Sequence, residues 1–316
     1  MKMRTAFLAG IALAFAPASG VPAMAQSDYP NQPVQLTAGF PGGGTIDSIN
    51  RLIVECIDFD GEVVAVPQPG AGGTIASADV AKATPGGYTL LLEPSGVLLS
   101  RPIFAKLTFS HESFEPIATV GALVTGIKVP ASSRFSNWAE METFARENPG
   151  QLLASTSGVG SLGHLALVTL AERHGIEITH VPFPNGPEAI GAAVGGHVDM
   201  FFGDNLHPEL SMLVTSHTER VARLPDTPTF TELGLDGMSW VVRVMMSAPK
   251  DTPEDILRTW ETKLEDVVQS SCYADGMDRL GWAPLFEGRD RLLELWPEEF
   301  ERNKAIIESL GAAYYQ

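Results

Sequence analysis

The sequence has little positive charge. Its Lys and Arg residues number 21 against 38 Asp and Glu residues, which gives a formal net charge of −17 at pH 7 over 316 residues. This excess of acid argues against binding to nucleic acid and to anionic membrane surfaces, because both require clustered positive charge. It leaves open an anionic small ligand, because a single site can be locally positive inside an acidic protein.

Long apolar runs are missing, and none reaches the about 20 residues that a membrane-spanning helix needs. The apolar stretch at residues 6–16 is too short, and its surroundings are those of a secretory signal peptide. Lys2 and Arg4 precede the stretch, and the sequence AMA at residues 23–25 forms a small-residue cleavage site. We therefore expect residues 1–25 to be a signal peptide that directs the protein to the periplasm.

Cysteine is scarce as well, and the two residues present, Cys56 and Cys272, lie far apart in the chain. In an oxidising compartment they could form a disulfide, but the sequence does not say whether they meet in the fold. Two buried free thiols explain the sequence equally well, so both alternatives stay open.

The motifs of common enzymes and nucleotide-binding proteins are absent. The chain has no G-x-x-x-x-G-K-[ST] loop, no H-E-x-x-H and no Cys/His spacing typical of zinc. Ser161 lies in VGSLG, which lacks the first glycine of a nucleophile elbow. Asp47 and Asp204 could form a carboxylate pair for acid–base chemistry, but no further residue supports it. We expect no enzymatic activity, no catalytic residue, no metal and no cofactor.

Strands and helices alternate in two stretches of the chain. In the first, the strand-like segments VQLTAGF, EVVAVP and GYTLLLEPSG are separated by glycine-rich turns and helical segments. In the second, which starts near residue 127, QLLAST, IEITHVPF and VDMFFGD alternate with helices. A later strand, WVVRVMMSAP, precedes an amphipathic helix and a C-terminal helical segment that Pro297 should break or kink. This alternation predicts an α/β protein with parallel strands and helices on the sheet faces.

Three glycine-rich turns share one design, in which a strand ends, glycines follow and a helix starts. They lie at residues 42–47 (GGGTID), 70–74 (GAGGT) and 157–161 (SGVGS). Such turns expose backbone N–H groups at a helix start, where the helix dipole favours negative charge. One turn of this kind is commonly a simple helix cap. Three of them, divided between the two stretches, favour a carboxylate held between two lobes.

The third turn also contains a perfect G-x-G-x-x-G in Gly158, Gly160 and Gly163, with Glu177 near the place of a ribose-binding acid. A dinucleotide site is nevertheless disfavoured, because the motif lies mid-chain in a protein with a signal peptide. Nicotinamide cofactors are not normally available outside the cytoplasm.

Single charged residues suggest further contacts. Asp204 ends the apolar strand VDMFFGD, where α/β proteins commonly place ligand contacts, and Asp47 is equally well explained as a helix-start residue. Arg243 lies inside an apolar strand and requires an anionic partner. An internal carboxylate is one candidate for that partner, and a ligand carboxylate is the other.

Ordered blocks of sequence resemble the substrate-binding receptors of tripartite tricarboxylate transporters, also called Bug receptors. The resemblance covers nearly everything from Tyr29 to Gly311. Its matching blocks read YPNQPVQL, FPGGGTIDSINR, PGAGGTIASADVAKATPGGYTLL, FEPIATV, NPGQLLASTSGVGSLGHLA, HVPFPNGPEAIGAAVGGHVDMFF, TSHTERVARLPDTPTFTELG and APKDTPEDI. The ordered set is specific, although no single block would be.

The resemblance implies a type II periplasmic-binding-protein fold, with two α/β domains joined by hinge strands and a ligand cleft between them. Domain I would comprise residues 26–125 and 235–316, and domain II residues 126–234. The lobes would close on a small organic carboxylate by a hinge motion. The partners implied are the membrane subunits of a tripartite tricarboxylate transporter, with no nucleic acid, and the receptor would be a monomer.

Together with the reading of single residues, the resemblance yields a set of ligand-binding residues on the strand-end loops of both domains. They are Gly43, Gly44, Thr45, Asp47, Ser95, Gly96, Ser157, Gly158, Gly160, Ser161, Asp204 and Arg243.

The chain departs from the family pattern at several places. Thr45 stands where the family carries the third glycine of its first turn, residues 208–215 form a shortened segment, and Arg243 replaces a frequent tryptophan. These departures weaken any transfer of ligand identity. Two other functions remain as alternatives: a ligand sensor for a membrane signalling protein, and an exported hydrolase that uses Ser161 or the aspartates.

Overall fold

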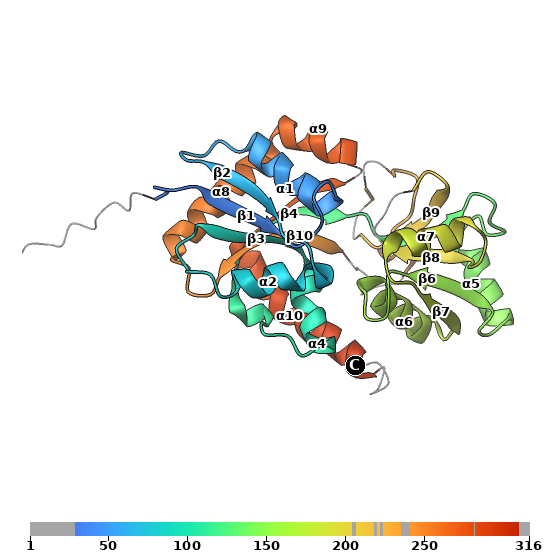
Figure 1. Ribbon diagram of the computed structural model, residues 1–316. Helices are drawn as coiled ribbons and strands as arrows, with labels where there is room; N and C mark the ends of the chain where they lie inside the picture. The colour runs from blue at the N-terminus through green and yellow to red at the C-terminus, as the bar shows by residue number, and fades with distance from the viewer. Residues whose placement is uncertain are drawn as a thin grey trace, which may run out of the picture.

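The computed structural model describes residues 29–203, 207–217, 220–221, 224–234, 241–280 and 282–309. Within these ranges the chain forms two β-sheets, each with helices packed against it (Figure 1). The predicted α/β class is therefore confirmed. The predicted signal peptide, residues 1–25, and the predicted ligand contact Asp204 lie outside the described residues.

The first sheet contains strands from both ends of the chain. Its strands are β1 (Val34–Ala38), β2 (Val63–Pro67), β3 (Thr89–Pro94), β4 (Phe114–Leu123), β10 (Val242–Pro249) and β11 (Ala283–Gly288). Their spatial order is β11-β4-β10-β3-β1-β2. β1 is parallel to β2 and β3, as expected for strands joined by helices, and β10 is antiparallel to β3 and β4. The carboxyl ends of β1, β2 and β3 therefore share one edge of the sheet.

The second sheet is built from the middle of the chain. Its strands are β5 (Gly126–Pro130), β6 (Leu152–Thr156), β7 (Ile178–Pro182), β8 (Met200–Gly203) and β9 (Leu210–Thr215). Their order is β7-β6-β8-β5-β9, with β6 parallel to β7 and β8, and β5 antiparallel to β8 and β9. The carboxyl ends of β6 and β8 lie together at one edge, where the turn after β6 starts.

Helices cover both sheets. Those that pack with the first sheet are α1 (Thr45–Cys56), α2 (Thr74–Val80), α3 (Ser95–Leu99), α4 (Arg101–Phe104), α8 (Glu254–Gln269), α9 (Ser271–Leu280) and α10 (Arg289–Ser309). Those that pack with the second sheet are α5 (Trp138–Glu147), α6 (Leu162–His174) and α7 (Gly186–Val194). Short 3-10 helices are η1 (Ala71–Gly73), η2 (His111–Ser113) and η3 (Thr231–Leu233).

Helix α8 shows how sequence pattern produces the packing. Its apolar residues recur at helical spacing, and Leu257, Trp260, Leu264 and Val267 are buried on one face. That face joins the core of the first sheet, which includes Leu36 of β1. Burying such side chains contributes about 1.5–3 kcal/mol each, so this stripe anchors the helix. The amphipathic helix predicted from sequence is confirmed.

The chain passes from the first sheet to the second between β4 and β5. The two linking residues, Val124 and Thr125, are buried, and Thr125 lines the cleft that lies between the two sheets. After β9 the chain returns to the first sheet as β10.

Helix α10 links the two halves of the molecule. It is continuous through Pro297, so of the break or kink that the sequence suggested, the break does not occur. Near its C-terminal end, Ile307 is fully buried in the core of the second sheet, and Ile103 and Phe104 at α4 pack against the same core. Helices α4 and α10 therefore pack against the core of the second sheet on this side of the cleft.

A disulfide joins Cys56 at the end of α1 to Cys272 in α9, with the two Cα atoms 5.9 Å apart. The sequence left pairing and two free thiols equally open, and the structure shows the pair. The bond fixes α9 to α1 on the outer side of the first sheet and closes a loop of 216 residues in sequence separation. No helix in the described ranges is both long and apolar enough to cross a membrane.

Candidate functional site

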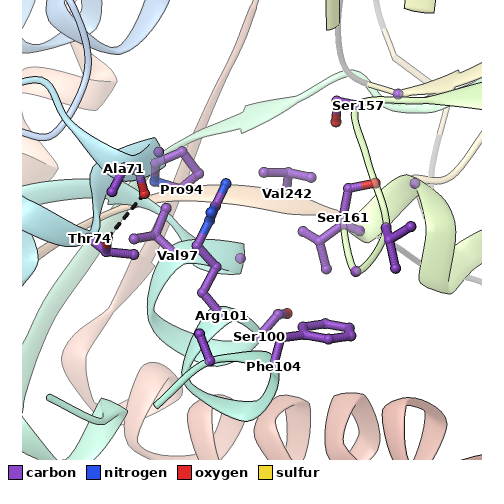
Figure 2. A pocket seen from close by; sticks show the side chains of 18 of the residues that line it. Ala71, Thr74, Pro94, Val97, Ser100, Arg101, Phe104, Ser157, Ser161 and Val242 are labelled. Atoms are coloured by element: carbon purple, nitrogen blue, oxygen red, sulfur yellow. Dashed lines mark hydrogen bonds between the residues drawn. The ribbon is translucent and has the colours of Figure 1, made fainter. Parts of the chain in front are cut away.

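A cleft of about 750 Å³ lies where the strand ends and turns of the two sheets meet (Figure 2). Much of its surface is apolar. The apolar side chains that line it, apart from alanines, are Phe40, Pro94, Val97, Phe104, Leu107, Val159, Leu162, Phe202 and Val242. The polar side chains are Thr74, Ser100, Arg101, Thr125, Ser157 and Ser161. Small residues, among them Gly72, Gly96, Gly160 and Gly163, give access to the backbone.

The turn between β6 and α6 forms one wall of the cleft. Gly158 and Gly160 have φ angles of 121° and 77°, a region that glycine adopts without strain. Ser161 caps α6, because its Oγ accepts a hydrogen bond from the N–H of His164 at 3.2 Å. The first two residues of α6 line the cleft, and their N–H groups have no acceptor within the helix. Together with the helix dipole, these groups make the wall suitable for an anion.

Two stacked histidines pack against this turn. The rings of His164 and His180 lie 4.1 Å apart at an interplanar angle of 16°. His164 Nδ1 accepts a hydrogen bond from the N–H of Gly160 at 3.0 Å, and His180 Nε2 lies 2.7 Å from Thr156 Oγ1. Burial lowers the pKa of His164. Burial and the neighbouring His164 lower the pKa of His180 to about 4. Both rings are therefore neutral at neutral pH, and the acceptor for Gly160 is retained.

Arg101 stands on the opposite wall, at the start of α4, and its side chain rises into the cleft (Figure 2). A Cβ atom on Gly72 would lie 2.4 Å from the Nη2 atom of Arg101, so the guanidinium passes directly over this glycine. Gly72 has a φ of 62°, and Thr74 Oγ1 donates a hydrogen bond to Ala71 O at 3.0 Å to close the same turn. The guanidinium of Arg101 thus packs on the second glycine turn of the sequence.

Glu93 lies at the end of β3 beneath this wall and is fully buried. Its carboxyl group is wedged between the backbones of Gly39 and Gly73, where added Cβ atoms would come within 2.1 and 2.9 Å of its oxygens. Burial raises the pKa of Glu93 well above its usual range, although the Gly39 backbone and the charge of Arg101 act in the opposite direction. Enclosure by the two glycine backbones thus disfavours the charged form of Glu93.

The structure brings part of the predicted site together. The predicted residues that line the cleft are Gly96, Ser157, Gly160 and Ser161. Those that do not line it are Gly43, Gly44, Thr45, Asp47, Ser95, Gly158 and Arg243. Ser95 is buried at the start of α3, directly before Gly96.

The first glycine turn is closed by its own aspartate. Asp47 Oδ2 accepts hydrogen bonds from the N–H of Gly43 and from Arg51 Nε, each at 2.8 Å. The N–H of Gly44 donates to the carbonyl of Pro41 at 3.0 Å. Asp47 is fully buried, so its carboxylate occupies the place where the turn would hold an external anion.

Arg243 has internal carboxylate partners. Its Nη2 donates to Glu287 Oε1 at 3.1 Å, its Nε pairs with Oε2 of the same side chain, and its Nη1 pairs with Glu299. Burial lowers the pKa of Arg243, but the bonds to Glu287 and the charge of Glu299 outweigh it and leave the pKa above its ordinary value. Of the two partners that the sequence left open, the structure contains the internal one.

Sequence analysis did not select Arg101. The available signal was an arginine a few residues after the third strand, inside the otherwise apolar segment GVLLSRPIFA. Among the residues that line the cleft it is the one with a charged side chain, within the described part of the chain. The described residues contain no group of three or more His, Cys, Asp or Glu that could hold a metal.

Comparison with known proteins identifies the family. The sequence model described as "Tripartite tricarboxylate transporter family receptor" matches residues 59–312. A Pseudomonas sp. (strain P51) protein, described as "UPF0065 protein in tcbD-tcbE intergenic region", is 31% identical, with 96% of this chain and 94% of that protein covered.

Solved structures agree in fold. A TctC solute binding protein from Polaromonas, without ligand, superposes with a TM-score of 0.77 at 22% identity and covers 89% of this chain and 99% of its own. A structure of an R. palustris protein with adipate gives a TM-score of 0.73 at 25% identity, covering 89% and 98%. The fold is thus that of the periplasmic solute-binding proteins, as the sequence predicted. The chain belongs to the tripartite tricarboxylate transporter receptor family.

Proposed function

We propose that this receptor captures a small organic carboxylate in the periplasm and presents it to the membrane subunits of a tripartite tricarboxylate transporter. The observation that carries the proposal is the cleft, in which Arg101 stands on one wall and α6 starts on the other. A guanidinium and unpaired helix-start amides both form strong, charge-assisted hydrogen bonds with a carboxylate. An anion between them would hold the two walls together.

A relative supports the chemical class of the ligand. The R. palustris protein that superposes on this chain at 25% identity was solved with adipate, which is an organic carboxylate. The cleft suits such a ligand, because it combines an apolar surface with a few polar groups.

Closure would occur between two domains, residues 26–125 with 235–316 and residues 126–234. Two crossings of the chain support this division: the passage from β4 to β5 and the return from β9 to β10. One contact that crosses the cleft is between α3 and α6, where a Cβ on Gly96 would lie 3.4 Å from Leu162. A hinge at the crossings would open and close this contact.

The ligand contacts that we propose on the second domain are Ser157, Gly160 and Ser161, which line the cleft with the start of α6. On the first domain they include Gly96. The turn with Gly43, Gly44, Thr45 and Asp47 would join them if closure moved the Asp47 carboxylate away from the N–H of Gly43, and Phe40 near its start already lines the cleft. Asp204, Ser95 and Gly158 complete the proposed set, as the resemblance of the sequence implies.

Calorimetric titration of residues 26–316 with a panel of carboxylates tests the proposal, with neutral amides and sugars as controls. Ser157 is exposed, lines the cleft and offers a hydroxyl, so Ser157→Ala should weaken binding about threefold to tenfold. Ser132→Ala, at an exposed turn outside the cleft, is the matched control and should bind as the wild type does. Absence of binding by every acid would refute the proposal.

Two further readouts separate the receptor from its rivals. A ligand recovered unchanged after long incubation supports a non-enzymatic receptor over an exported hydrolase. Vesicles that contain the transporter's membrane subunits test delivery. Ligand uptake that requires this protein, added as a monomer, supports delivery over signalling. Uptake that proceeds equally without the protein would contradict the delivery role.

A further inference from the structure

We infer that the cleft selects a monocarboxylate with an apolar, ring-sized body, whose carboxylate binds Arg101 and whose body lies among the aromatic side chains of the cleft. This inference rests on the proposed function and adds the ligand class and the residue that anchors it. It differs from a site for tricarboxylates or small hydroxy acids, which carry several polar groups over a short body.

The aromatic side chains come from three separate parts of the fold. Phe40 follows β1, Phe104 belongs to α4, and Phe202 lies in β8 of the second sheet. Val97 and Val242 extend the apolar surface between them. Because hydroxyl or carboxylate groups placed against these side chains would lose water without gaining partners, an apolar body is favoured there.

The described lining offers one full positive charge. The side chain of Arg101 is exposed and forms no ion pair or hydrogen bond with the described part of the chain. Glu93, whose charge interacts with that of Arg101, is enclosed by Gly39 and Gly73, and burial raises its pKa well above the usual range. Burial therefore disfavours the charged form of Glu93, which leaves the charge of Arg101 available to a ligand.

The position of Arg101 fits the role of an anchor. Its guanidinium passes over Gly72, where a side chain would collide with it, so the glycine turn directs the guanidinium along the wall. Figure 2 shows the side chain rising from α4 toward the space between Pro94 and Val242. A planar guanidinium there can bind a carboxylate through two parallel hydrogen bonds.

The volume of the cleft agrees with a ring-sized body. The space of about 750 Å³ lies within the range of about 300–1,000 Å³ that sites for drug-sized ligands occupy. A small hydroxy diacid would leave most of the apolar surface in contact with water. Binding of such an acid would therefore lack the larger part of the hydrophobic contribution to the binding free energy.

Titration with defined probes tests the inference. The probe is 3-phenylpropionate, and the comparison ligands are its neutral amide, adipate, malate and citrate. The protein comprises residues 26–316 and is first unfolded and refolded with its disulfide intact, which removes co-purified ligand. We expect 3-phenylpropionate to bind at least about tenfold more tightly than each comparison ligand. The amide lacks the charged group that bonds to Arg101, and the other acids would place polar groups against the apolar side chains.

Two variants separate anchoring from folding. Arg101→Gln should weaken binding of 3-phenylpropionate by about tenfold or more and leave binding of its amide unchanged. Arg101→Lys keeps the charge but not the planar guanidinium, so its affinity for 3-phenylpropionate should lie between those of the wild type and Arg101→Gln. Arg146→Gln, at an exposed site on α5, is the matched control and should bind as the wild type does. Thermal unfolding of each variant checks that the fold is intact.

The outcomes are distinct. Tightest binding of 3-phenylpropionate together with its loss in Arg101→Gln supports the inference. Tighter binding of citrate, malate or adipate overturns it while the proposed function stands. Equal binding of 3-phenylpropionate by wild type and Arg101→Gln removes Arg101 as the anchor. No binding of any acid overturns the inference and the proposed function together.

Discussion

The phenyl ring of Phe104 lies directly against Gly160, so that a Cβ atom on this glycine would come within 2.6 Å of the ring atoms Cε2 and Cζ. Phe104 belongs to α4 beside the first sheet, and Gly160 belongs to the turn that starts α6 on the second. The pair therefore joins the two walls of the cleft at one point. Figure 2 shows the ring at the foot of that turn.

Replacement of this glycine should abolish ligand binding. Gly160→Val adds a branched side chain at a φ of 77° and collides with Phe104, so the turn must shift and the walls must separate. The strain is of order 1–3 kcal/mol, which the whole fold can tolerate. Circular dichroism should be unchanged while titration shows no binding. Gly191→Ala in α7, where a Cβ meets nothing within 4 Å, is the control and should bind normally.

The stacked histidines predict loss of stability in acid. Because burial lowers the pKa of His180 to about 4, the unfolded chain binds more protons than the folded chain between that pH and about 6.5. The contribution of neutral His180 to the free energy of unfolding is fully present above pH 6.5 and is lost as the pH falls toward 4. With partial exposure taken into account, the loss is about 1–2 kcal/mol.

Denaturant unfolding at several pH values measures this effect. His180→Gln should flatten the fall in unfolding free energy between pH 6.5 and 4, because it removes the titrating group. His197→Gln, on an exposed residue, should leave the slope as in the wild type. An identical slope in the wild type and His180→Gln would show that the stacked pair does not titrate as described.

Removal of the disulfide should lower stability without affecting the cleft. Double replacement of Cys56 and Cys272 by serine opens a cross-link between residues 216 positions apart, and such a loss costs about 2–5 kcal/mol. For a chain of this size, each kcal/mol shifts the unfolding midpoint by about 2–4 °C. Neither cysteine lines the cleft, so titration should give the wild-type affinity. A midpoint unmoved by the double replacement would mean that the cross-link contributes nothing to stability.

Arg243 should prove structural. Arg243→Met leaves Glu287 and Glu299 without their partner, and breaking such a buried pair costs about 3 kcal/mol or more. Affinity for a carboxylate should be unchanged, because Arg243 does not line the cleft. Arg146→Met, which removes an exposed ion pair, should cost no more than about 0.5 kcal/mol. Loss of affinity in folded Arg243→Met would restore the ligand-contact role that the sequence suggested.

Local patterns predicted the elements well, since strand and helix periodicities are local properties of the chain. The turn at residues 157–161 illustrates this, because a strand, two glycines at positive φ and a capping serine suffice to specify an open helix start. The predicted cleft residues Ser157, Gly160 and Ser161 follow from that pattern. The amphipathic stripe of α8 was equally readable.

Contacts between residues far apart in the chain could not be predicted from the sequence. No pattern near Arg101 shows that α4 folds back so that the guanidinium lies over Gly72. The first turn is glycine-rich like the third, but Asp47 fills it, and only three-dimensional geometry reveals that the N–H groups of Gly43 and Gly44 are already used. The partners of Arg243 lie 44 and 56 positions away in the chain, which periodicity cannot connect.

The most direct test of the carboxylate-receptor account is thermal unfolding of ligand-free residues 26–316 against a panel of organic acids, with amides and sugars as controls. A ligand at a hundred times its dissociation constant stabilises by about 2.7 kcal/mol, which corresponds to a rise of about 5–10 °C for this chain. We predict such a rise with carboxylates that have an apolar body, and its loss in Gly160→Val. An unmoved midpoint with every acid, in protein shown by native mass spectrometry to carry no ligand, would contradict the account.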